Sequence, residues 1–70
     1  MLLKVIEKCM LDDEKMGLRV YHYKSNKNNL NDAKLDLLKN FDSDNIIYSD
    51  DDFEEDCLDS EILEITMLNE

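Results

Sequence analysis

The sequence of 70 residues contains no proline, no tryptophan and a single glycine, Gly17. Proline and glycine are the residues that interrupt regular structure most strongly, and flexible linkers are enriched in glycine. Their scarcity excludes a linker chain and indicates regular elements that are joined by short turns of Asn and Asp. The hydrophobic content of 43% is typical of a folded protein. We therefore expect one domain over residues 1–70, with a core so small that its stability is marginal.

Positive charge is absent from the second half of the chain, since no lysine or arginine follows Lys39. Residues 1–39 hold eight Lys and Arg and six Asp and Glu, whereas residues 40–70 hold twelve Asp and Glu, which gives the net charge of −10. A half with one sign of charge is destabilised by self-repulsion. Because the acids lower the stability of the protein, we expect that they serve a function. The alternative is that they arose by drift in a small acidic protein.

Long apolar runs are also absent. Lys4, Glu7 and Lys8 interrupt the N-terminal segment, which therefore lacks the pattern of a signal peptide, and no stretch approaches the length that spans a membrane. We expect a cytoplasmic protein in which Cys9 and Cys57 are free thiols. Two cysteines can form one disulfide, but their spacing gives no support for it.

The first half of the chain predicts a β-hairpin followed by a helix. Residues 18–24 are rich in β-branched and aromatic side chains, as strands are. Residues 2–11 fit a strand and a helix about equally well, and the neighbouring strand favours a hairpin. Apolar residues of segment 30–41 recur at helical spacing, and Asn29 is a suitable N-cap with Asp32 in the first turn.

The second half predicts a strand at 46–49, a short acidic helix at 50–58 and a final strand at 61–69. Ser49 and Asp52 match the S-x-x-D pattern with which helices begin, and acids suit a helix N-terminus. The final segment carries apolar residues on both faces, which is typical of a central strand. The expected fold is an α+β domain with a small, mostly antiparallel sheet and two helices, in the order β-β-α-β-α-β.

The sequence offers little for catalysis. His22 is the only histidine, it lies in an expected strand, and neither Cys9 nor Cys57 stands at a distance from it that is typical of nucleophile–base pairs. A chain of this size has little room for a pocket that excludes water. We therefore expect that the protein is not an enzyme and that His22 is a half-buried strand residue.

Cofactor and metal sites are not indicated either. An EF-hand loop that begins at Asp50 would have Glu55 at position 6, where the sharp turn requires glycine. The spacing of Cys9, His22 and Cys57 is not that of a zinc site, and a Gly-rich phosphate loop is missing. We expect no cofactor and no dedicated metal site. The net charge also disfavours direct binding to nucleic acids or to anionic membranes.

Acidic residues are concentrated in one segment. From Ser49 to Glu61, eight of thirteen residues are Asp or Glu and none is Lys or Arg. A patch of one sign attracts a basic surface in a fast and salt-sensitive association. On a helix over 50–58, acids at i, i+1, i+4 and i+5 would form a ridge of carboxylates that can stand where DNA phosphates stand. The predicted partner-binding residues are Asp50, Asp51, Asp52, Glu54, Glu55, Asp56 and Asp59, with Tyr48 as an aromatic anchor. The alternative is a solvated face without a partner.

In size, acidity and mixed α/β order, the chain resembles the small phage-encoded inhibitors that block host defence nucleases or DNA-repair enzymes, some of them by mimicking DNA. The resemblance is one of composition over the whole chain and involves no motif, so no residue role is carried over. It implies a non-catalytic inhibitor, of anti-CRISPR or anti-restriction type, in the cytoplasm of an infected or host bacterial cell. Its partner would be a basic nuclease or another nucleic-acid-binding enzyme.

A second function is open to this sequence, namely a small structural or regulatory subunit or an antitoxin. Such a protein would bind its partner through an apolar interface made of strand edges and the helix at 30–41. Salt separates the two functions, because a charged interface weakens steeply as salt rises and an apolar interface does not. A homodimer is compatible with both, because the core of 70 residues is small.

Overall fold

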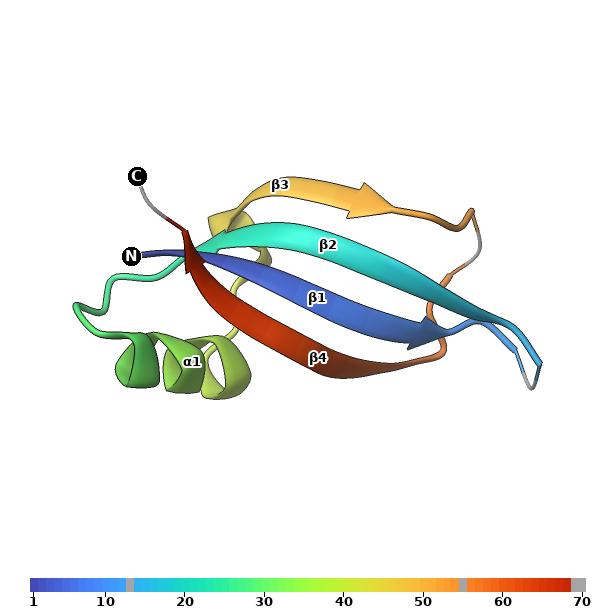
Figure 1. Ribbon diagram of the computed structural model, residues 1–70, viewed down its shortest axis with the longest axis horizontal. Coiled ribbons are helices and arrows are strands. Elements are labelled where there is room, and N and C mark those ends of the chain that lie inside the picture. The colour runs from blue at the N-terminus through green and yellow to red at the C-terminus, as the bar shows by residue number, and fades with distance from the viewer. Residues whose placement is uncertain (13, 55, 69–70) are drawn as a thin grey trace.

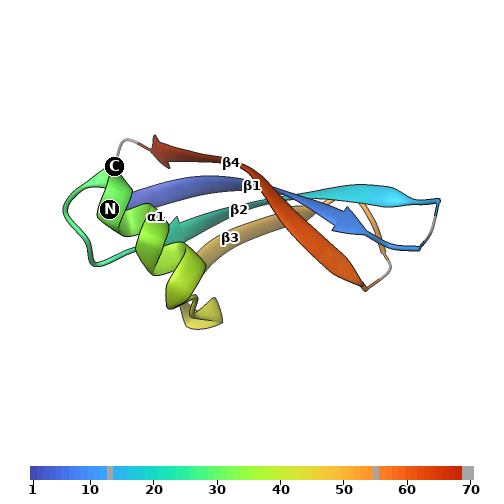
Figure 2. The ribbon, with the colours of Figure 1, turned by 90° about the horizontal axis from the view of Figure 1, so that it is seen from below.

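The structure is a computed structural model that describes residues 1–12, 14–54 and 56–68. The described residues form one antiparallel sheet in the order β3-β2-β1-β4, with one α-helix on one of its faces (Figures 1 and 2). The elements are β1 (Leu2–Met10), β2 (Met16–Lys24), α1 (Leu30–Lys39), the short 3-10 helix η1 (Ser43–Asn45), β3 (Ile46–Asp51) and β4 (Asp59–Leu68). The molecule is elongated, with extents of 39 × 20 × 19 Å.

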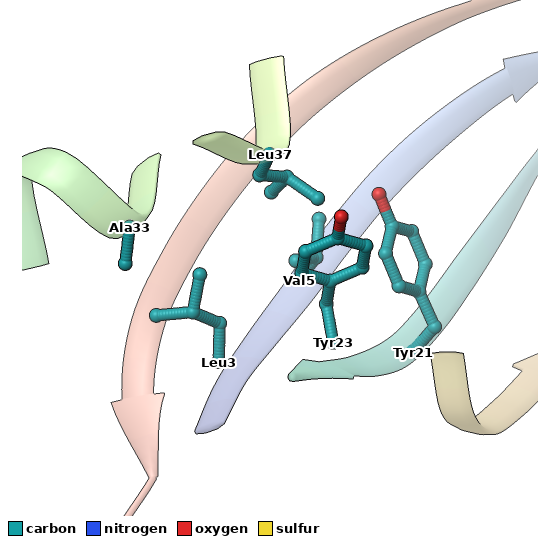
Figure 3. Packing of buried hydrophobic residues seen from close by; sticks show 6 residues of the cluster. All are labelled: Leu3, Val5, Tyr21, Tyr23, Ala33 and Leu37. Carbon is teal, nitrogen blue, oxygen red and sulfur yellow. The ribbon is translucent and has the colours of Figure 1, made fainter. Parts of the chain in front are cut away.

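The core lies between α1 and the two central strands. β1 and β2 pair from Leu2 opposite Lys24 to Met10 opposite Met16, which confirms the predicted hairpin. Because side chains alternate along a strand, every second residue of each strand points to the helix. The buried cluster consists of Leu3, Val5, Tyr21, Tyr23, Ala33 and Leu37 (Figure 3). α1 covers only one end of the sheet, and the remainder of that face extends away from it (Figure 1).

The predicted helix is confirmed, and so is its N-cap. The side chain of Asn29 accepts a hydrogen bond of 2.8 Å from the backbone N–H of Asp32, a contact that stabilises a helix by about 1 kcal/mol. The helix ends at Lys39, two residues before Phe41. Outside the helix, Phe41 stacks on the buried ring of Tyr23 with ring centroids 5.5 Å apart and remains 50% exposed.

The prediction that the last strand is central is wrong, because β4 is an edge strand. Its pairing with β1 shifts by one residue, from Ile6 opposite Glu64 to Glu7 opposite Ile62, which leaves Leu63 as an extra, bulged residue. A bulge transfers the following residues to the other face. Ile62 and Ile65 therefore both pack against the core although they are three residues apart. The bulge therefore accounts for the apolar residues that the sequence shows at both odd and even positions of this strand.

The prediction of a helix at 50–58 is also wrong. The predicted order β-β-α-β-α-β and the predicted fold with two helices are therefore wrong as well. β3 continues to Asp51, and the described residues between β3 and β4 are irregular. Asp52 explains the difference, because its N–H donates to the carbonyl of Leu18 (3.1 Å) and its carboxylate accepts from the N–H of Leu18 (2.6 Å). Pairing with β2 thus occupies the groups that would have capped a helix.

Helices that could cross a membrane are not found in the part of the chain that the structure describes.

Candidate functional site

The connection from β3 to β4 folds across the end of the β1–β2 hairpin (Figure 1). It is fixed at both ends, since Asp52 is hydrogen bonded to Leu18 and the N–H of Leu58 donates to the carbonyl of Met10 (2.8 Å). Met10 is the last residue of β1 before the hairpin loop, and Leu18 lies two residues into β2 after it. The acids of the loop and of the connection therefore lie at the same end of the molecule. We call this surface the acidic tip; it comprises the exposed residues Asp12, Glu14, Asp50, Asp52, Glu54, Asp56 and Asp59.

Phe53, directly after Asp52, anchors the beginning of the connection on the sheet. Its ring lies so close to Gly17 that a Cβ atom at that position would overlap it. The backbone of Gly17 does not have a positive φ, so the close approach of the ring is what requires glycine there. The guanidinium of Arg19 lies 5.8 Å from the centroid of the Phe53 ring, a favourable cation–π distance. The connection is therefore held on a defined scaffold.

Asp51 has a structural role. Its carboxylate accepts a hydrogen bond of 3.0 Å from Nε of Arg19, whose Nη1 donates to Glu7 at 3.3 Å. Burial alone would lower the pKa of Arg19, but the charge and hydrogen bond of Asp51 together with Cys9 and Glu7 outweigh it, and the pKa is raised. Asp51 thus shares the single positive charge of Arg19 with Glu7 on the helix-facing side of the sheet. This carboxylate is a poor candidate for contact with a partner.

Tyr48 lies on the opposite face of the sheet. It stands across from His22 in the β2–β3 pairing, with ring centroids 4.9 Å apart, and Asp50 follows it on the same face. Tyr48 is 50% exposed, whereas His22 is partly buried as predicted. The anchor residue and the carboxylate of Asp51 therefore point to different sides of the sheet.

The thiols of Cys9, in β1, and Cys57, in the connection, are adjacent. Cys9 is fully buried and lies opposite Ser60 in the β1–β4 pairing, and the thiol of Cys57 donates to the carbonyl of Asp59 (3.0 Å). Burial and the adjacent thiol of Cys57 raise the pKa of Cys9 to about 12. Both cysteines are free thiols in the structure.

The predicted partner-binding residues do not all lie on one surface. Asp50, Asp52, Glu54, Asp56 and Asp59 belong to the acidic tip, and Glu55 lies outside the described residues. They do not form a helical ridge, because the described residues between β3 and β4 are irregular.

Asp12 and Glu14 belong to the same surface and were missed by the sequence analysis. The signal that could have found them is the hairpin itself, whose loop must lie at the end of the sheet where β3 ends and β4 begins. Asp12 accepts hydrogen bonds of 2.8 Å from the N–H groups of Glu14 and Lys15. The bond from Glu14 is the larger cause that lowers the pKa of Asp12. Its carboxylate therefore keeps its charge to a lower pH than usual.

Within the described ranges, groups of three or more His, Cys, Asp or Glu with the arrangement of a metal site are not found. The acids of the tip are spread over the surface and do not converge on one point. The arrangement is suited to long-range attraction of a positive surface.

The architecture is that of a small ββαββ domain, a class that does not by itself define an activity. No family model matches the chain, and no curated protein and no solved structure is significantly similar to it. A functional inference therefore depends on the acidic tip and on the surfaces next to it.

Proposed function

We propose that the protein is a non-catalytic inhibitor which binds a basic nucleic-acid-handling enzyme through the acidic tip, in the cytoplasm of a bacterial cell. The observation that supports this proposal is that two acidic segments, far apart in the sequence, lie toward the same end of the sheet. The basic surfaces common in cells are the nucleic-acid channels of nucleases, polymerases and repressors. A net charge of −10 favours such partners and disfavours nucleic acid itself.

The scaffold beneath the acids supports a specific interaction. Backbone hydrogen bonds fix both ends of the connection, and Phe53, next to Asp52, packs on Gly17. Carboxylates that are already placed lose less entropy on binding than those of a flexible tail. The acids are not arranged in a helical row. The proposal therefore does not require them to match the spacing of DNA phosphates, only to occupy the basic channel of the enzyme.

Capture of the partner tests the proposal. The tagged chain is immobilised, exposed to a nuclease-treated lysate of a bacterium with active restriction and CRISPR systems, and washed with rising salt or with duplex DNA. We expect retention of a nucleic-acid-handling enzyme that DNA and salt both displace, and loss of that enzyme's activity when the purified chain is added. A partner that ignores both salt and DNA would contradict the proposal.

A pair of variants with equal net charge locates the contact. Glu54→Gln with Asp56→Asn and the single change Asp44→Lys each raise the net charge by two. All three carboxylates are exposed, and Asp44 lies in η1, at the opposite end of β3 from the acidic tip (Figure 1). We expect the tip variant to bind the captured enzyme about ten-fold more weakly and the control to bind as the wild type does. Equal weakening of both would show that only the total charge matters.

The second function, an apolar interface of a regulatory subunit or antitoxin, is favoured by a different observation. Leu38, Leu63 and Met67 are 59%, 52% and 53% exposed on α1 and β4. An interface formed by these residues alone would resist salt, which distinguishes it from the acidic tip in the same capture experiment.

A further inference from the structure

The outer edge of β4 is open over ten residues. Within the described part of the chain, β4 pairs with β1 on one side and with no strand on the other. An edge strand presents backbone N–H and C=O groups to which another strand can pair. Proteins commonly protect such edges with lysine, proline, charged side chains or a β-bulge, or by keeping the strand short. β4 has ten residues and neither lysine nor proline, and its bulge at Leu63 and its three acids restrict which strand can pair with it. This edge is therefore available for strand addition.

A mainly apolar groove lies between β4 and α1. It is open to solvent, has a volume of about 280 Å³, and is lined by Lys34, Leu38, Ile62, Leu63, Glu64 and Ile65. Leu38 and Leu63 are more than half exposed, and Met67, further along β4, is exposed to the same degree. Alternate side chains of an added strand would point into this groove, because strand residues alternate between the two faces of a sheet.

The charge of β4 selects the kind of strand that fits. β4 carries Asp59, Glu61 and Glu64 and contains no Lys or Arg. Glu61 and Glu64 stand opposite Lys8 and Ile6 of β1, on the face away from α1, and Lys8 lies 3.6 Å from Glu61.

A second copy of the chain fits poorly at this edge. Antiparallel pairing of two β4 strands would bring all three acids from each copy into one ladder, and like charges across a ladder are destabilising. A strand in which Lys or Arg alternates with apolar residues matches the edge on both faces. Its basic side chains would meet Glu61 and Glu64, and its apolar side chains would enter the groove.

We propose that the β4 edge and the adjoining groove bind an extended basic segment of the partner enzyme as a fifth strand of the sheet. This inference rests on the proposed function, since it states how the same basic partner is held. β4 begins at Asp59 in the acidic tip, so the two surfaces are continuous. The tip attracts the partner at long range, and backbone pairing with β4 then fixes its orientation.

Two peptides of equal composition test the inference. The first is an N-acetylated, C-amidated octapeptide of alternating Lys and Val; the second joins the same four Lys and four Val as two blocks. Each is titrated into the ¹⁵N-labelled full chain, and amide shifts and hydrogen exchange are recorded. We expect the alternating peptide to bind about ten-fold more tightly than the block peptide, because only it presents one charged and one apolar face. We expect its shifts to follow β4, Lys34 and Leu38, with slower exchange of amides in β4.

Variants of the two edges provide the matched control. Leu63→Glu adds a like charge to the β4 edge, and Ile47→Glu makes the same change in β3; the two side chains are 52% and 59% exposed. We expect Leu63→Glu to weaken the alternating peptide about ten-fold and Ile47→Glu to leave it unchanged. If Leu63→Glu fails to fold, Leu38→Glu replaces it, because Leu38 of α1 lines the same groove.

Each outcome is decisive. Equal affinity of the two peptides, equal effects of the two edge variants, or shifts confined to the acidic tip or to β3 would overturn strand addition at β4. Shifts confined to the tip would leave the proposed electrostatic function intact. A complete lack of binding by both peptides at low salt would contradict both proposals.

Discussion

Arg19 joins three elements of the protein at one point. Its side chain contacts Asp51 of β3 at 3.0 Å and Glu7 of β1 at 3.3 Å, and lies over the ring of Phe53. The side chain of Glu7 is only 12% exposed, so its carboxylate depends on Arg19 for a charged partner. Removing one partner of such a pair destabilises a protein because the other charge remains desolvated.

Arg19→Met tests this role. We expect the free energy of unfolding in urea to fall by about 1–3 kcal/mol, since a partly buried carboxylate loses its charged hydrogen bonds. Lys24→Met, at the exposed end of β2, is the control and should change stability by less than about 0.5 kcal/mol. Equal stability of the two variants would contradict the structural role assigned to Arg19.

Two buried residues give the protein an alkaline limit. Burial and the adjacent Cys57 thiol raise the pKa of Cys9 from 9.0 to about 12, and burial followed by the charge of Glu7 raises that of Tyr21 from 10.0 to about 12. Both groups hold their protons more tightly in the folded chain than in the unfolded chain. Their contribution is therefore complete below about pH 9 and is lost as the pH rises toward 12.

The expected result is a urea midpoint that falls steadily from about pH 9 to pH 11, and falls less steeply in Cys9→Ala. Urea unfolding, followed by circular dichroism at a series of pH values, measures it. A midpoint that stays constant up to pH 11 would show that neither group is desolvated in the folded state.

At the scale of elements, local patterns were sufficient for the hairpin and for α1. Alternating apolar residues and the cap at Asn29 involve neighbours in the sequence, so they can be recognised without knowledge of the fold. The S-x-x-D pattern at Ser49 was misleading because Asp52 bonds to Leu18, 34 residues earlier. The bulge at Leu63 likewise depends on pairing with β1 and leaves only a broken alternation in the sequence.

Gly17→Ala tests how the connection is attached to the sheet. The added methyl group would overlap the ring of Phe53 and lie 3.1 Å from Oδ1 of Asp52. We expect a loss of about 1–3 kcal/mol in the free energy of unfolding, together with amide shifts in residues 52–58.

The double variant Gly17→Ala with Phe53→Ala provides the control for this contact. Once the ring is removed, the methyl group should cost little more, so the two changes should not be additive. Additive effects would mean that the ring of Phe53 does not pack on Gly17.

At the scale of the whole molecule, the fold concentrates the negative charge. The hairpin loop and the β3–β4 connection meet at one end, which adds Asp12 and Glu14 to acids that follow residue 49 (Figure 1). The acidity of the site could be predicted from the sequence, but its extent could not. The order β3-β2-β1-β4 and the hydrogen bonds of the connection decide which acids are neighbours and which, such as Asp51, are paired with a cation.

Self-repulsion of the acidic tip makes a prediction for the isolated protein. We expect the melting temperature to rise between about 20 and 500 mM NaCl, because salt screens the repulsion among exposed carboxylates. The rise should be smaller in Glu54→Gln with Asp56→Asn than in the wild type. A melting temperature that falls with added salt would mean that attractive ion pairs dominate over this repulsion.

The salt dependence of binding to the captured enzyme tests the central claim most directly. Dissociation constants are measured between about 50 and 500 mM NaCl for the wild type, for Glu54→Gln with Asp56→Asn and for Asp44→Lys. The acidic-tip model predicts steep weakening with salt in the wild type and in Asp44→Lys, and a distinctly shallower dependence in the tip variant. The same slope for all three proteins would contradict it, because the acids at the end of the sheet would then not be the surface that the enzyme contacts.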